Sequence, residues 1–514
     1  MSVLSLLKNI FIGMLLLLVI LTIIILIKTI LYPFAKNVAT QSDYRDTDTS
    51  SAELKRFSGG IRIPTISNPD YSQTNFKPFD EFKVYLRQSY PEVYKSMDTA
   101  IINGYGLVYH WKGKNASLKP VLYLAHYDVV PVNNYNPSSE IKAPVIFNVD
   151  DKPSPPITDI QTKWDFPPFS GAITNGRVYG RGTLDMKCML FGLMEASSQL
   201  INKGFQPDRD VFFAFGQDEE VGGLNGAAKI AEYFKSKNIE FDAVYDEGGI
   251  IAAPGLAGIG KSIALIGTAE KGFLTLKIKV KGTGGHSSMP PQNTSLVQAA
   301  NIIQQLEKDQ MKSEIIPPME NFLRNVGGEM SFISRVAIAN QWLLKPLLTS
   351  TLTKSANTNA LVRTTTAVTM AKGSDAANVL PTVSEVVVNF RLLPGTKVVQ
   401  VVNHVEDICQ GYDTDIEILS EREASDISPE NTDGFNNMKK QISRLYPSAI
   451  TTSYLTVGGT DAYRYQIVSK NIYRFLPLEI NENEQKIIHG YNEYISIDNY
   501  RKMIHYFRGM MEKQ

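Results

Sequence analysis

Short apolar runs that alternate with helical patterns constrain the fold of this chain more than any other feature. Residues 121–125, 211–215 and 241–245 have the length and composition of buried strands, and helical patterns over residues 186–202 and 227–236 lie between them. This alternation predicts an α/β catalytic domain in which a mostly parallel sheet is flanked by helices. In such sheets, ligand sites form beyond the carboxyl ends of the strands.

An imidazole and a carboxylate follow the first of these runs. His126 and Asp128 are two residues apart, so on a strand they point to one face while Tyr127 points to the other. A neutral imidazole is a common metal ligand, and a nearby carboxylate can orient it. An isolated His-x-Asp pair is more often an exposed strand end. Whether this pair indicates a metal site therefore depends on the residues that follow.

Acidic residues also stand beside the later predicted elements. Asp185 lies just before the helical pattern that begins at residue 186, a position where an aspartate often serves only as an N-cap. Residues 218–220 are three successive acids after the second strand, and Asp246 and Glu247 follow the third. A solvated acidic turn would explain residues 218–220, but the apolar strand before them and the glycines after them favour a pocket.

These residues have the composition of a two-metal hydrolytic site. Two cations about 3.5–4 Å apart share one bridging carboxylate in such sites. The chain supplies a suitable set of ligands: His126, Asp185, Glu220, Asp246 and His489. Glu219 is then left over as a base. Imidazole and carboxylate ligands suit zinc, and manganese or cobalt can substitute for it.

Other classes of function are less compatible with the sequence. Residues 255–262 match a phosphate-binding loop, but strand-like residues 263–266 follow them, so no helix N-terminus is available to hold a phosphate. No G-x-S-x-G motif of a serine hydrolase is present. The 52 basic and 52 acidic residues balance, so we expect no nucleic-acid partner.

The N-terminal segment has the pattern of a membrane anchor. Residues 10–27 are uncharged and rise roughly 27 Å as a helix, close to the thickness of a bilayer core. Lys8 and Lys28 flank them and can reach either interface. A cleaved signal peptide is the alternative, but the run is long for one and no A-x-A-like site follows closely. Residues 1–35 are therefore predicted to form a single-pass transmembrane anchor.

The rest of the chain divides by pattern. Residues 36–58 are polar and read as a linker, and residues 59–267 form the first part of the catalytic domain. Apolar and polar residues alternate over 274–281, which indicates a strand with one wet face. The β-α-β-β-α-β-like order after it predicts a smaller, ferredoxin-like α+β domain over residues 268–422, inserted before the second part of the catalytic domain at 423–514. A long loop over residues 141–168 is predicted to form a pocket rim.

Taken together, the motifs resemble the M20 family of zinc metallopeptidases, in particular its branch of carboxypeptidase S and secreted N-fatty-acyl-amino-acid hydrolases. The resemblance runs from about residue 80 to the C-terminus through AHYDVVP, WDFPPFSG, GRGTLDMK, FGQDEEVGG, DEGG, GTGGHSSMPP, NVLP, GGTDA and IHGYNE. It implies two zinc ions held by His126, Asp185, Glu220, Asp246 and His489. Asp185 would bridge them, Asp128 would support the site and Glu219 would be the general base. Members differ in whether the position of Asp246 or that of Glu247 supplies the ligand.

The resemblance also assigns roles in the inserted domain, which it implies is a lid and a dimerisation surface. His286 matches a histidine that stabilises the oxyanion, often across a homodimer. Asn378 and Arg391 match positions near the substrate carboxylate, and Thr460 of GGTDA is a further substrate-binding candidate. The alternatives are a turn histidine, a loop asparagine and a solvated strand arginine. Arg464 lies one place later than the arginine that usually follows this motif, so its role stays open.

The sequence thus predicts a membrane-anchored, di-zinc amide hydrolase that acts on small substrates with a free carboxylate. Short peptides cut at the C-terminal residue and N-acyl amino acids both fit this description. One alternative is an enzyme that reversibly makes and hydrolyses N-acyl amino acids, and another is an inactive, membrane-tethered binding protein. Resemblance to anchored relatives favours a lumenal or extracellular catalytic domain, in the secretory pathway, a vacuole or outside the cell.

Overall fold

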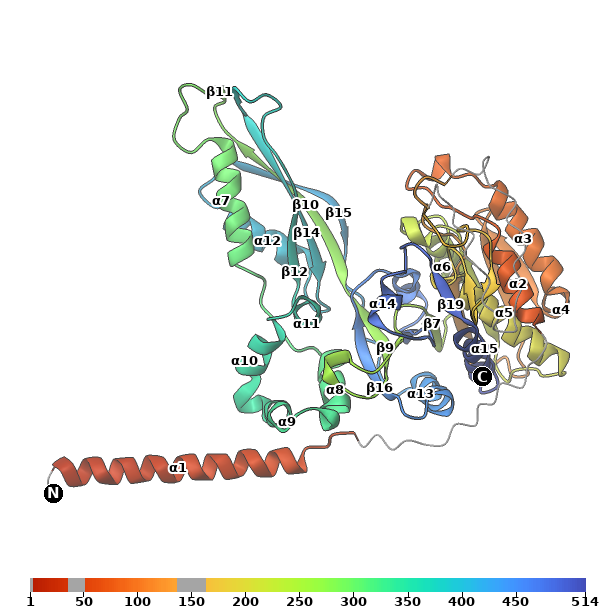
Figure 1. Cartoon of the computed structure of the whole chain (residues 1–514), viewed down its shortest axis with the longest axis horizontal. Coiled ribbons are helices and arrows are strands. Elements are labelled where there is room, and N and C mark those ends of the chain that lie inside the picture. The colour runs from red at the N-terminus through yellow and green to blue at the C-terminus, as the bar shows by residue number, and fades with distance from the viewer. Residues whose placement is uncertain (1–2, 36–50, 136–162) are drawn as a thin grey trace. The chain divides into compact units, whose positions relative to one another are not determined.

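The computed structural model describes residues 3–35, 51–135 and 163–514 (Figure 1). Most of the predicted linker and of the predicted pocket rim therefore lies outside the described residues. The chain divides into two compact units. Unit 1 comprises Met1–Asn37 and Glu270–Ser425, and unit 2 comprises Val38–Ala269 and Asp426–Gln514. The second segment of unit 1 is thus inserted between the two segments of unit 2.

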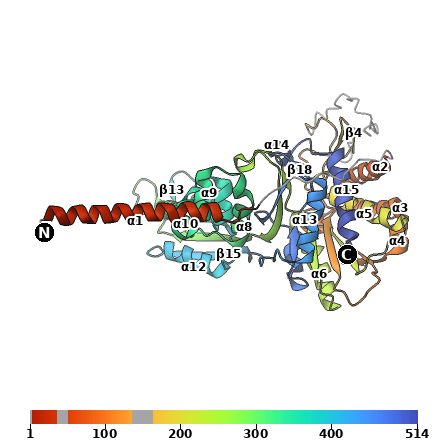
Figure 2. The same ribbon diagram turned by 90° about the horizontal axis from the view of Figure 1, so that it is seen from below.

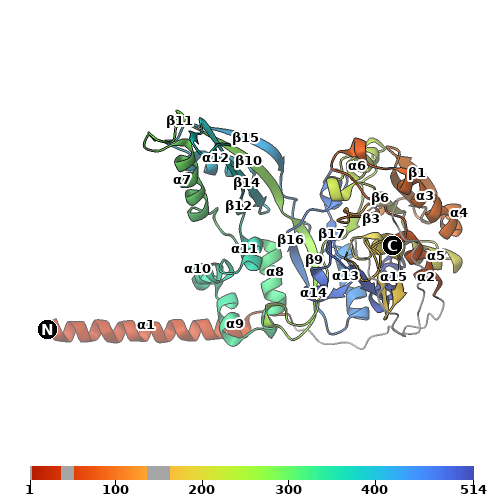
Figure 3. The same cartoon turned by 45° about the horizontal axis from the view of Figure 1, so that its top comes forward.

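Unit 2 is built on a ten-stranded sheet in the order β1-β2-β6-β3-β7-β17-β9-β8-β18, with β16 paired to β9. The strands are β1 (Asp98–Ile102), β2 (Gly106–Trp111), β3 (Val121–His126), β6 (Val211–Gly216), β7 (Ala243–Asp246), β8 (Ile251–Ala252), β9 (Ile263–Glu270), β16 (Ile450–Thr456), β17 (Ile472–Arg474) and β18 (Glu479–Ile480). Figure 3 shows β3, β6 and β17 near the middle of this sheet. A small sheet of β4 (Ile173–Thr174), β5 (Arg177–Tyr179) and β19 (Tyr494–Ser496) accompanies it.

The large sheet is mixed, which corrects the prediction of a mostly parallel one. Strands β6, β3, β7 and β17 run parallel, as expected of strands that follow helical crossovers. The β1–β2 hairpin adds an antiparallel edge beside β6. On the other side β9 pairs antiparallel with both β17 and β8. Short connections make the β1–β2 and β8–β9 pairs antiparallel, because a parallel pair needs a long crossover.

Helices cover both faces of the large sheet. One core contains residues of α2 (Ala52–Ile61), α3 (Lys77–Ser89), α4 (Pro91–Ser96), α5 (Lys187–Asn202), α13 (Asp433–Leu445) and α15 (Ile497–Met511). The other core contains residues of α6 (Ala227–Ser236) and of the 3₁₀ helix η6 (Asp461–Ile467). The short α14 (Glu482–Gln485) precedes the loop that carries His489. All six residues of β3 are buried, as a continuous apolar strand between two layers requires.

Helix α2 begins inside the predicted linker, so that prediction was wrong for residues 52–58. Leu54, Phe57 and Ile61 are fully buried in the core of unit 2. They recur at helical spacing, and charged residues such as Lys55 and Arg56 stand between them. A stripe only three residues long is easily read as polar linker, because the charged face dominates its composition.

Unit 1 contains a four-stranded antiparallel sheet in the order β12-β14-β10-β15. The strands are β10 (Gly272–Lys281), β12 (Thr365–Lys372), β14 (Val383–Leu392) and β15 (Thr414–Arg422), and β11 (Gly285–His286) pairs with β13 (Val379–Leu380). Helices α7 (Ser295–Lys308) and α12 (Val398–Ile408) pack on one face of the sheet (Figure 1). Along β10, buried and half-buried residues alternate, as the sequence pattern predicted. The β-α-β-β-α-β order is therefore present.

Among its described residues, unit 1 contains further helices besides α7 and α12. Helix α1 (Val3–Leu31) is long and apolar enough to cross a membrane, by length and composition. Between α7 and β12 the chain forms α8 (Pro317–Val326), α9 (Phe332–Ala339), α10 (Gln341–Leu352) and α11 (Ala356–Val362). The sequence did not predict these four helices, since several of their apolar residues are exposed and leave no clean periodicity.

Candidate metal centre and catalytic site

His126 and Asp128 lie at the carboxyl end of β3, where an α/β sheet places its ligand sites. His126 Nδ1 lies 3.1 Å from the backbone oxygen of Asp128 and 3.3 Å from its Oδ1. These contacts leave Nε2 to face the other acidic residues. Tyr127 points the opposite way and stacks on Phe82 in the core. The strand alternation therefore turns Tyr127 into the core and His126 toward the acidic residues.

Asp185 stands between the two histidines. Its Oδ1 lies 3.0 Å from His126 Nε2, and its Oδ2 lies 2.9 Å from His489 Nε2. Helix α5 begins two residues later, so Asp185 precedes the helix but is not its N-cap, which is Met186. One carboxylate thus joins two donor groups, each built around one histidine.

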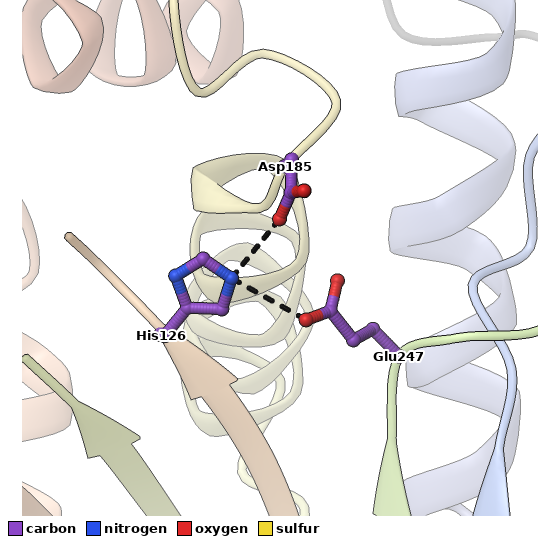
Figure 4. Close-up of side chains that lie close together, drawn as sticks. All are labelled: His126, Asp185 and Glu247. Carbon is purple, nitrogen blue, oxygen red and sulfur yellow. Dashed lines mark hydrogen bonds and ion pairs between the residues drawn. The ribbon is translucent and has the colours of Figure 1, made fainter. Parts of the chain in front are cut away.

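The first donor group consists of His126, Asp185 and Glu247 (Figure 4). Glu247 Oε1 lies 3.3 Å from His126 Nε2. The prediction named Asp246 here, and the structure places its neighbour instead. Strand β7 ends at Asp246, which is buried opposite Arg474 of β17. The next residue turns away from the sheet, which brings Glu247 and not Asp246 to the histidine.

The second donor group consists of Asp185, Glu220 and His489. His489 Nε2 lies 3.1 Å from Glu220 Oε2. Glu219 belongs to neither donor group, and its Oε2 lies 3.8 Å from His126 Nε2. Of these two adjacent glutamates, Glu220 therefore belongs to a donor group and Glu219 lies beside the donor groups.

Residues 218–220 are not a solvated turn, because Asp218 is buried and the other two side chains are mostly so. The Asp218 carboxylate accepts hydrogen bonds from the backbone N–H groups of Asn225 and Gly226 and closes the loop. Asp128 accepts the backbone N–H of Glu219 at 3.1 Å and that of Glu220 at 3.2 Å. Asp128 therefore supports both His126 and the turn that carries the two glutamates.

Burial raises the pKa values of the three site glutamates, Glu219, Glu220 and Glu247. Burial, followed by the charge of Asp185, raises the pKa of Glu247 to about 8 and that of Glu220 to about 7. Burial also raises the pKa of Glu219 well above its usual value. Burial opposes the ionisation of Asp185 too, but hydrogen bonds from the two histidines outweigh it and lower the pKa of Asp185.

The same hydrogen bonds favour charged imidazoles. Those that His489 donates to Asp185 and Glu220 raise the pKa of His489 to about 10. Burial lowers the pKa of His126, but its bonds with Asp128, Asp185 and Glu247 outweigh this effect and raise it well above its usual value. The site thus concentrates negative charge that a bound cation would offset.

Both donor groups fit a bound metal ion. In each group the three ligand atoms lie within 4.8 Å of one another. Glu220 Oε1 is buried and accepts no hydrogen bond from the described residues. Two imidazoles and three carboxylates are donors that suit zinc. The donor chemistry is thus compatible with two cations that share Asp185.

Arg181 and Glu493 are two residues of the site that the sequence did not suggest. Glu493 Oε1 accepts the backbone N–H groups of Gly182, Leu184 and Asp185, at 3.0, 2.8 and 3.3 Å. Arg181 Nη2 donates to the backbone oxygens of His489 and Gly490, at 3.2 and 3.1 Å. Both residues belong to motifs of the resemblance, GRGTLDMK and IHGYNE, and that position in the sequence was the available signal.

The Asp461 carboxyl packs closely against two glycines near the acidic turn, and this packing accounts for the absence of a side chain at both positions. A Cβ at Gly223 would lie 2.1 Å from Asp461 Oδ1, and a Cβ at Gly216 would lie 2.8 Å from Oδ2. Only glycine therefore allows this carboxyl to pack so closely, and Gly223 also has a φ of +64°. Burial, together with the nearby charge of Asp246, raises the pKa of Asp461 well above its usual value.

The remaining predicted residues of unit 2 have local roles. Thr460 accepts the backbone N–H of Ala462 and caps η6, and its side chain is buried. Arg464 Nη2 donates to the backbone oxygen of Gly222 at 2.7 Å, and its guanidinium lies 4.4 Å from the centre of the Tyr463 ring. Arg464 is thus attached to the loop that follows the two glutamates.

His286, Asn378 and Arg391 belong to unit 1. The structure brings the first two together, since β11 pairs with β13 and the backbone N–H of Ser287 donates to the backbone oxygen of Asn378. His286 is exposed, and its Nδ1 lies 2.8 Å from Ser288 Oγ. Arg391, on β14, has its guanidinium 5.6 Å from the centre of the Phe273 ring.

Comparisons with known proteins identify the family of the chain. A family model described as Peptidase family M20/M25/M40 matches residues 155–513, so the chain belongs to this family. It is 31% identical to a probable carboxypeptidase S-like 2 of Dictyostelium discoideum, over 97% of this chain and 92% of the relative. It is also 31% identical to the N-fatty-acyl-amino acid synthase/hydrolase PM20D1 of Xenopus tropicalis, over 95% and 92%. Carboxypeptidase S of Saccharomyces cerevisiae is 28% identical, over 87% and 81%.

Solved structures share the fold. An M20 family metallo-carboxypeptidase from Sulfolobus solfataricus matches with a TM-score of 0.62 at 19% identity, over 90% of this chain and 98% of that one. The di-peptidase Dug1p from Saccharomyces cerevisiae matches with a TM-score of 0.57 at 15% identity, over 90% and 95%. The chain is therefore a metallohydrolase of the M20 family and an enzyme that acts on amide bonds, as the sequence predicted.

Proposed function

We propose that this protein is a membrane-anchored di-zinc hydrolase that cleaves the amide bond of small substrates with a free carboxylate. The observation that carries the proposal is the position of Asp185, whose two oxygens face His126 and His489 separately. In our proposal His126 and Glu247 would hold one cation, Glu220 and His489 would hold the other, and Asp185 would contribute to both sites. Glu247 replaces the originally predicted Asp246, because it lies in the donor group.

The cations, when bound, supply Lewis-acid activation of a water molecule and of the scissile carbonyl. Glu219 accepts the proton of the attacking water and delivers it to the amine nitrogen as the C–N bond breaks. Its position beside the donor groups supports this role, because a carboxylate that is not a ligand keeps its lone pairs for the proton. Burial raises the pKa of Glu219 well above its usual value, which strengthens it as a proton acceptor. Asp128 orients His126 and the turn that carries Glu219.

For the substrate, short peptides and N-acyl amino acids both remain within the proposal. Relatives are named as carboxypeptidases and as N-fatty-acyl-amino acid synthase/hydrolases, so reversible synthesis is the second candidate activity. Membership of the family favours an enzyme over an inactive binding protein. We retain His286 as the residue that stabilises the oxyanion, and Asn378, Arg391 and Thr460 as substrate-binding residues, on the resemblance of their motifs. Lid closure and a homodimer through unit 1 belong to the same proposal.

Helix α1 supports the proposal of an anchor. Its 29 residues exceed the length that spans a bilayer, and no residue between positions 10 and 27 is charged. We propose that α1 stays in the mature protein and that the catalytic unit lies in the lumen or outside the cell. Alkaline carbonate extraction should then leave the chain in the membrane pellet. A mature N-terminus beyond residue 31 would show that α1 is removed.

The activity is tested with the full chain in mild detergent. Zinc-loaded enzyme should hydrolyse members of a dipeptide panel or of an N-acyl-amino-acid panel, and chelation should abolish the turnover. The same panels run toward synthesis, from a free fatty acid and an amino acid, test the second candidate. Absence of turnover on both panels at full zinc occupancy would contradict the proposal.

A further inference from the structure

Helices α9 and α10 of unit 1 carry an exposed apolar surface. It consists of Phe332, Ile333, Trp342, Leu343 and Leu347, and we call it the α9–α10 surface. Ile333 is 81% exposed, Leu347 is 62% exposed and Trp342 is 55% exposed. The two helices contact each other, so these side chains belong to one small helical layer. Large apolar side chains on adjacent helices commonly indicate a surface with a partner.

The charged residues within α9 and α10 have one sign, although the exposed Glu329 lies just before α9. Residues 330–362 contain Arg335, Lys345 and Lys354 but no aspartate or glutamate. The whole chain has equal numbers of acidic and basic residues, so this segment departs from its average composition. Apolar side chains together with cations, and without acids, are typical of helices that lie in the interfacial layer of a membrane.

The corner between α9 and α10 is attached to α1. Asn340 is fully buried, and its Nδ2 donates to the backbone oxygen of Ile25 at 3.2 Å and to Thr29 Oγ1 at 3.0 Å. Lys28 Nζ lies 4.9 Å from the centre of the Trp342 ring. Figures 1 and 2 both show α9 against the C-terminal part of α1.

The attachment to α1 determines how deep the α9–α10 corner lies relative to a bilayer that α1 spans. Ile25 lies near the end of the uncharged run of α1, and Lys28 is the first charged residue after it. Three residues of helix correspond to roughly 4.5 Å along the axis. If α1 spans a bilayer, Lys28 lies at its interface, and the α9–α10 corner lies within about one helical turn of that level. Tryptophan and lysine, which meet here, are the residues that favour this layer.

We propose that the α9–α10 surface docks into the interfacial layer of the bilayer that α1 spans. The inference rests on the proposed anchor and adds a second, peripheral contact between unit 1 and the lipid. The apolar side chains enter the boundary between head groups and acyl chains, and the cations face anionic head groups. A second copy of the chain is a poorer occupant, because a two-fold interface would bring the same cations together.

Cysteine accessibility tests this surface in the full chain. Both native cysteines, Cys188 and Cys409, are buried, so an introduced cysteine dominates the labelling. Ile333→Cys probes the surface, and Val399→Cys is the matched control, since Val399 is 60% exposed on α12 of the same unit. Each variant is treated with a membrane-impermeant maleimide, in open membrane sheets and after solubilisation in detergent.

We expect Ile333→Cys to lose its labelling in membranes and regain it in detergent, while Val399→Cys reacts equally in both. Equal reaction of both cysteines in membranes would overturn the proposal. If Ile333→Cys stays protected in detergent, and more so at higher protein concentration, the surface binds a second copy of the chain. That result would also overturn the proposal. Carbonate extraction of the same membranes tests α1 separately. If the chain stays in the pellet but Ile333→Cys reacts in membranes, the anchor is supported and the proposal for the α9–α10 surface is overturned. If the chain is released although Ile333→Cys was protected before extraction, the surface binds the membrane but α1 does not anchor the chain.

Discussion

Arg181 Nη1 donates a hydrogen bond of 2.6 Å to Glu493 Oε2, although the two residues are 312 positions apart in the chain. Both side chains are buried. Through their other contacts they tie the loop of Asp185 to the loop of His489, and each loop supplies a predicted metal ligand. Residues that hold ligands in place in this way contribute to metal affinity as well as to stability.

Glu493→Gln should therefore weaken metal binding without removing a ligand. We expect an affinity loss of about 10–100-fold, the range for residues that orient metal ligands. An unpaired Arg181 should also lower the free energy of unfolding by roughly 3–5 kcal/mol. Chelator competition measures the first effect and denaturant unfolding the second. Excess zinc should restore much of the activity of Glu493→Gln. The control is Glu512→Gln, because Glu512 is an exposed glutamate near the C-terminus, and it should change neither the metal affinity nor the free energy of unfolding.

Glu219 and Glu220 should separate into a base and a ligand. Glu219→Gln keeps the shape of the side chain but accepts no proton, so it should retain both metals and lose about 10²–10⁴-fold in kcat. Glu220→Gln should lose one metal, and activity with it. Metal analysis beside single-turnover kinetics distinguishes the two variants. Full zinc in Glu220→Gln with depletion in Glu219→Gln would reverse the assignment.

Asp246 and Glu247 provide a matched pair of adjacent acids. Glu247→Gln should reduce the zinc content toward one ion per chain, because Glu247 lies 3.3 Å from His126 Nε2. Asp246→Asn should keep both ions, since Asp246 belongs to neither donor group. Mass spectrometry of the metal content of both variants decides between them. Zinc loss in Asp246→Asn alone would restore the original prediction.

Metal affinity should rise with pH across the neutral range. In the metal-free protein the pKa of Glu220 is about 7, that of Glu247 about 8 and that of His489 about 10. Below each pKa the group holds a proton that a cation must displace, so acidification weakens binding and binding releases protons. Zinc affinity measured by competition between about pH 6 and pH 9 should show this slope. Glu219→Gln should keep it, because Glu219 is not a ligand, and a flat profile would argue against these groups as ligands.

His286→Ala should lower kcat by about 10²–10³-fold, the cost of removing one oxyanion donor. The metal content should not change, because His286 lies in unit 1 and belongs to neither donor group. His404→Ala is the matched control, since His404 is another histidine of the same unit, with its Nε2 2.9 Å from the backbone oxygen of Asp309. Partial recovery of activity on mixing His286→Ala with Glu219→Gln would indicate action across a dimer. An unchanged kcat in His286→Ala would make His286 a turn residue.

The sequence by itself determined the α/β class, the strand ends that carry His126 and Asp128, and the acidic turn at residues 218–220. These features depend on local rules, since strand alternation decides which side chains share a face and apolar runs decide which strands are buried. The alternation along β10 identified the inserted sheet for the same reason. Periodicity and short-range spacing were sufficient there.

Only the tertiary structure decided the features that depend on long-range contacts. Whether Asp246 or Glu247 faces His126 depends on where β7 ends, and neighbouring strands determine that end. The antiparallel pairs β2–β6 and β9–β17 join strands far apart in the chain, so no local pattern encodes them. The bond between Arg181 and Glu493 closes a loop of 312 residues, and the α9–α10 surface leaves apolar residues exposed. Sequence patterns identify residues that bury their own side chains, whereas these contacts require the whole chain to be folded.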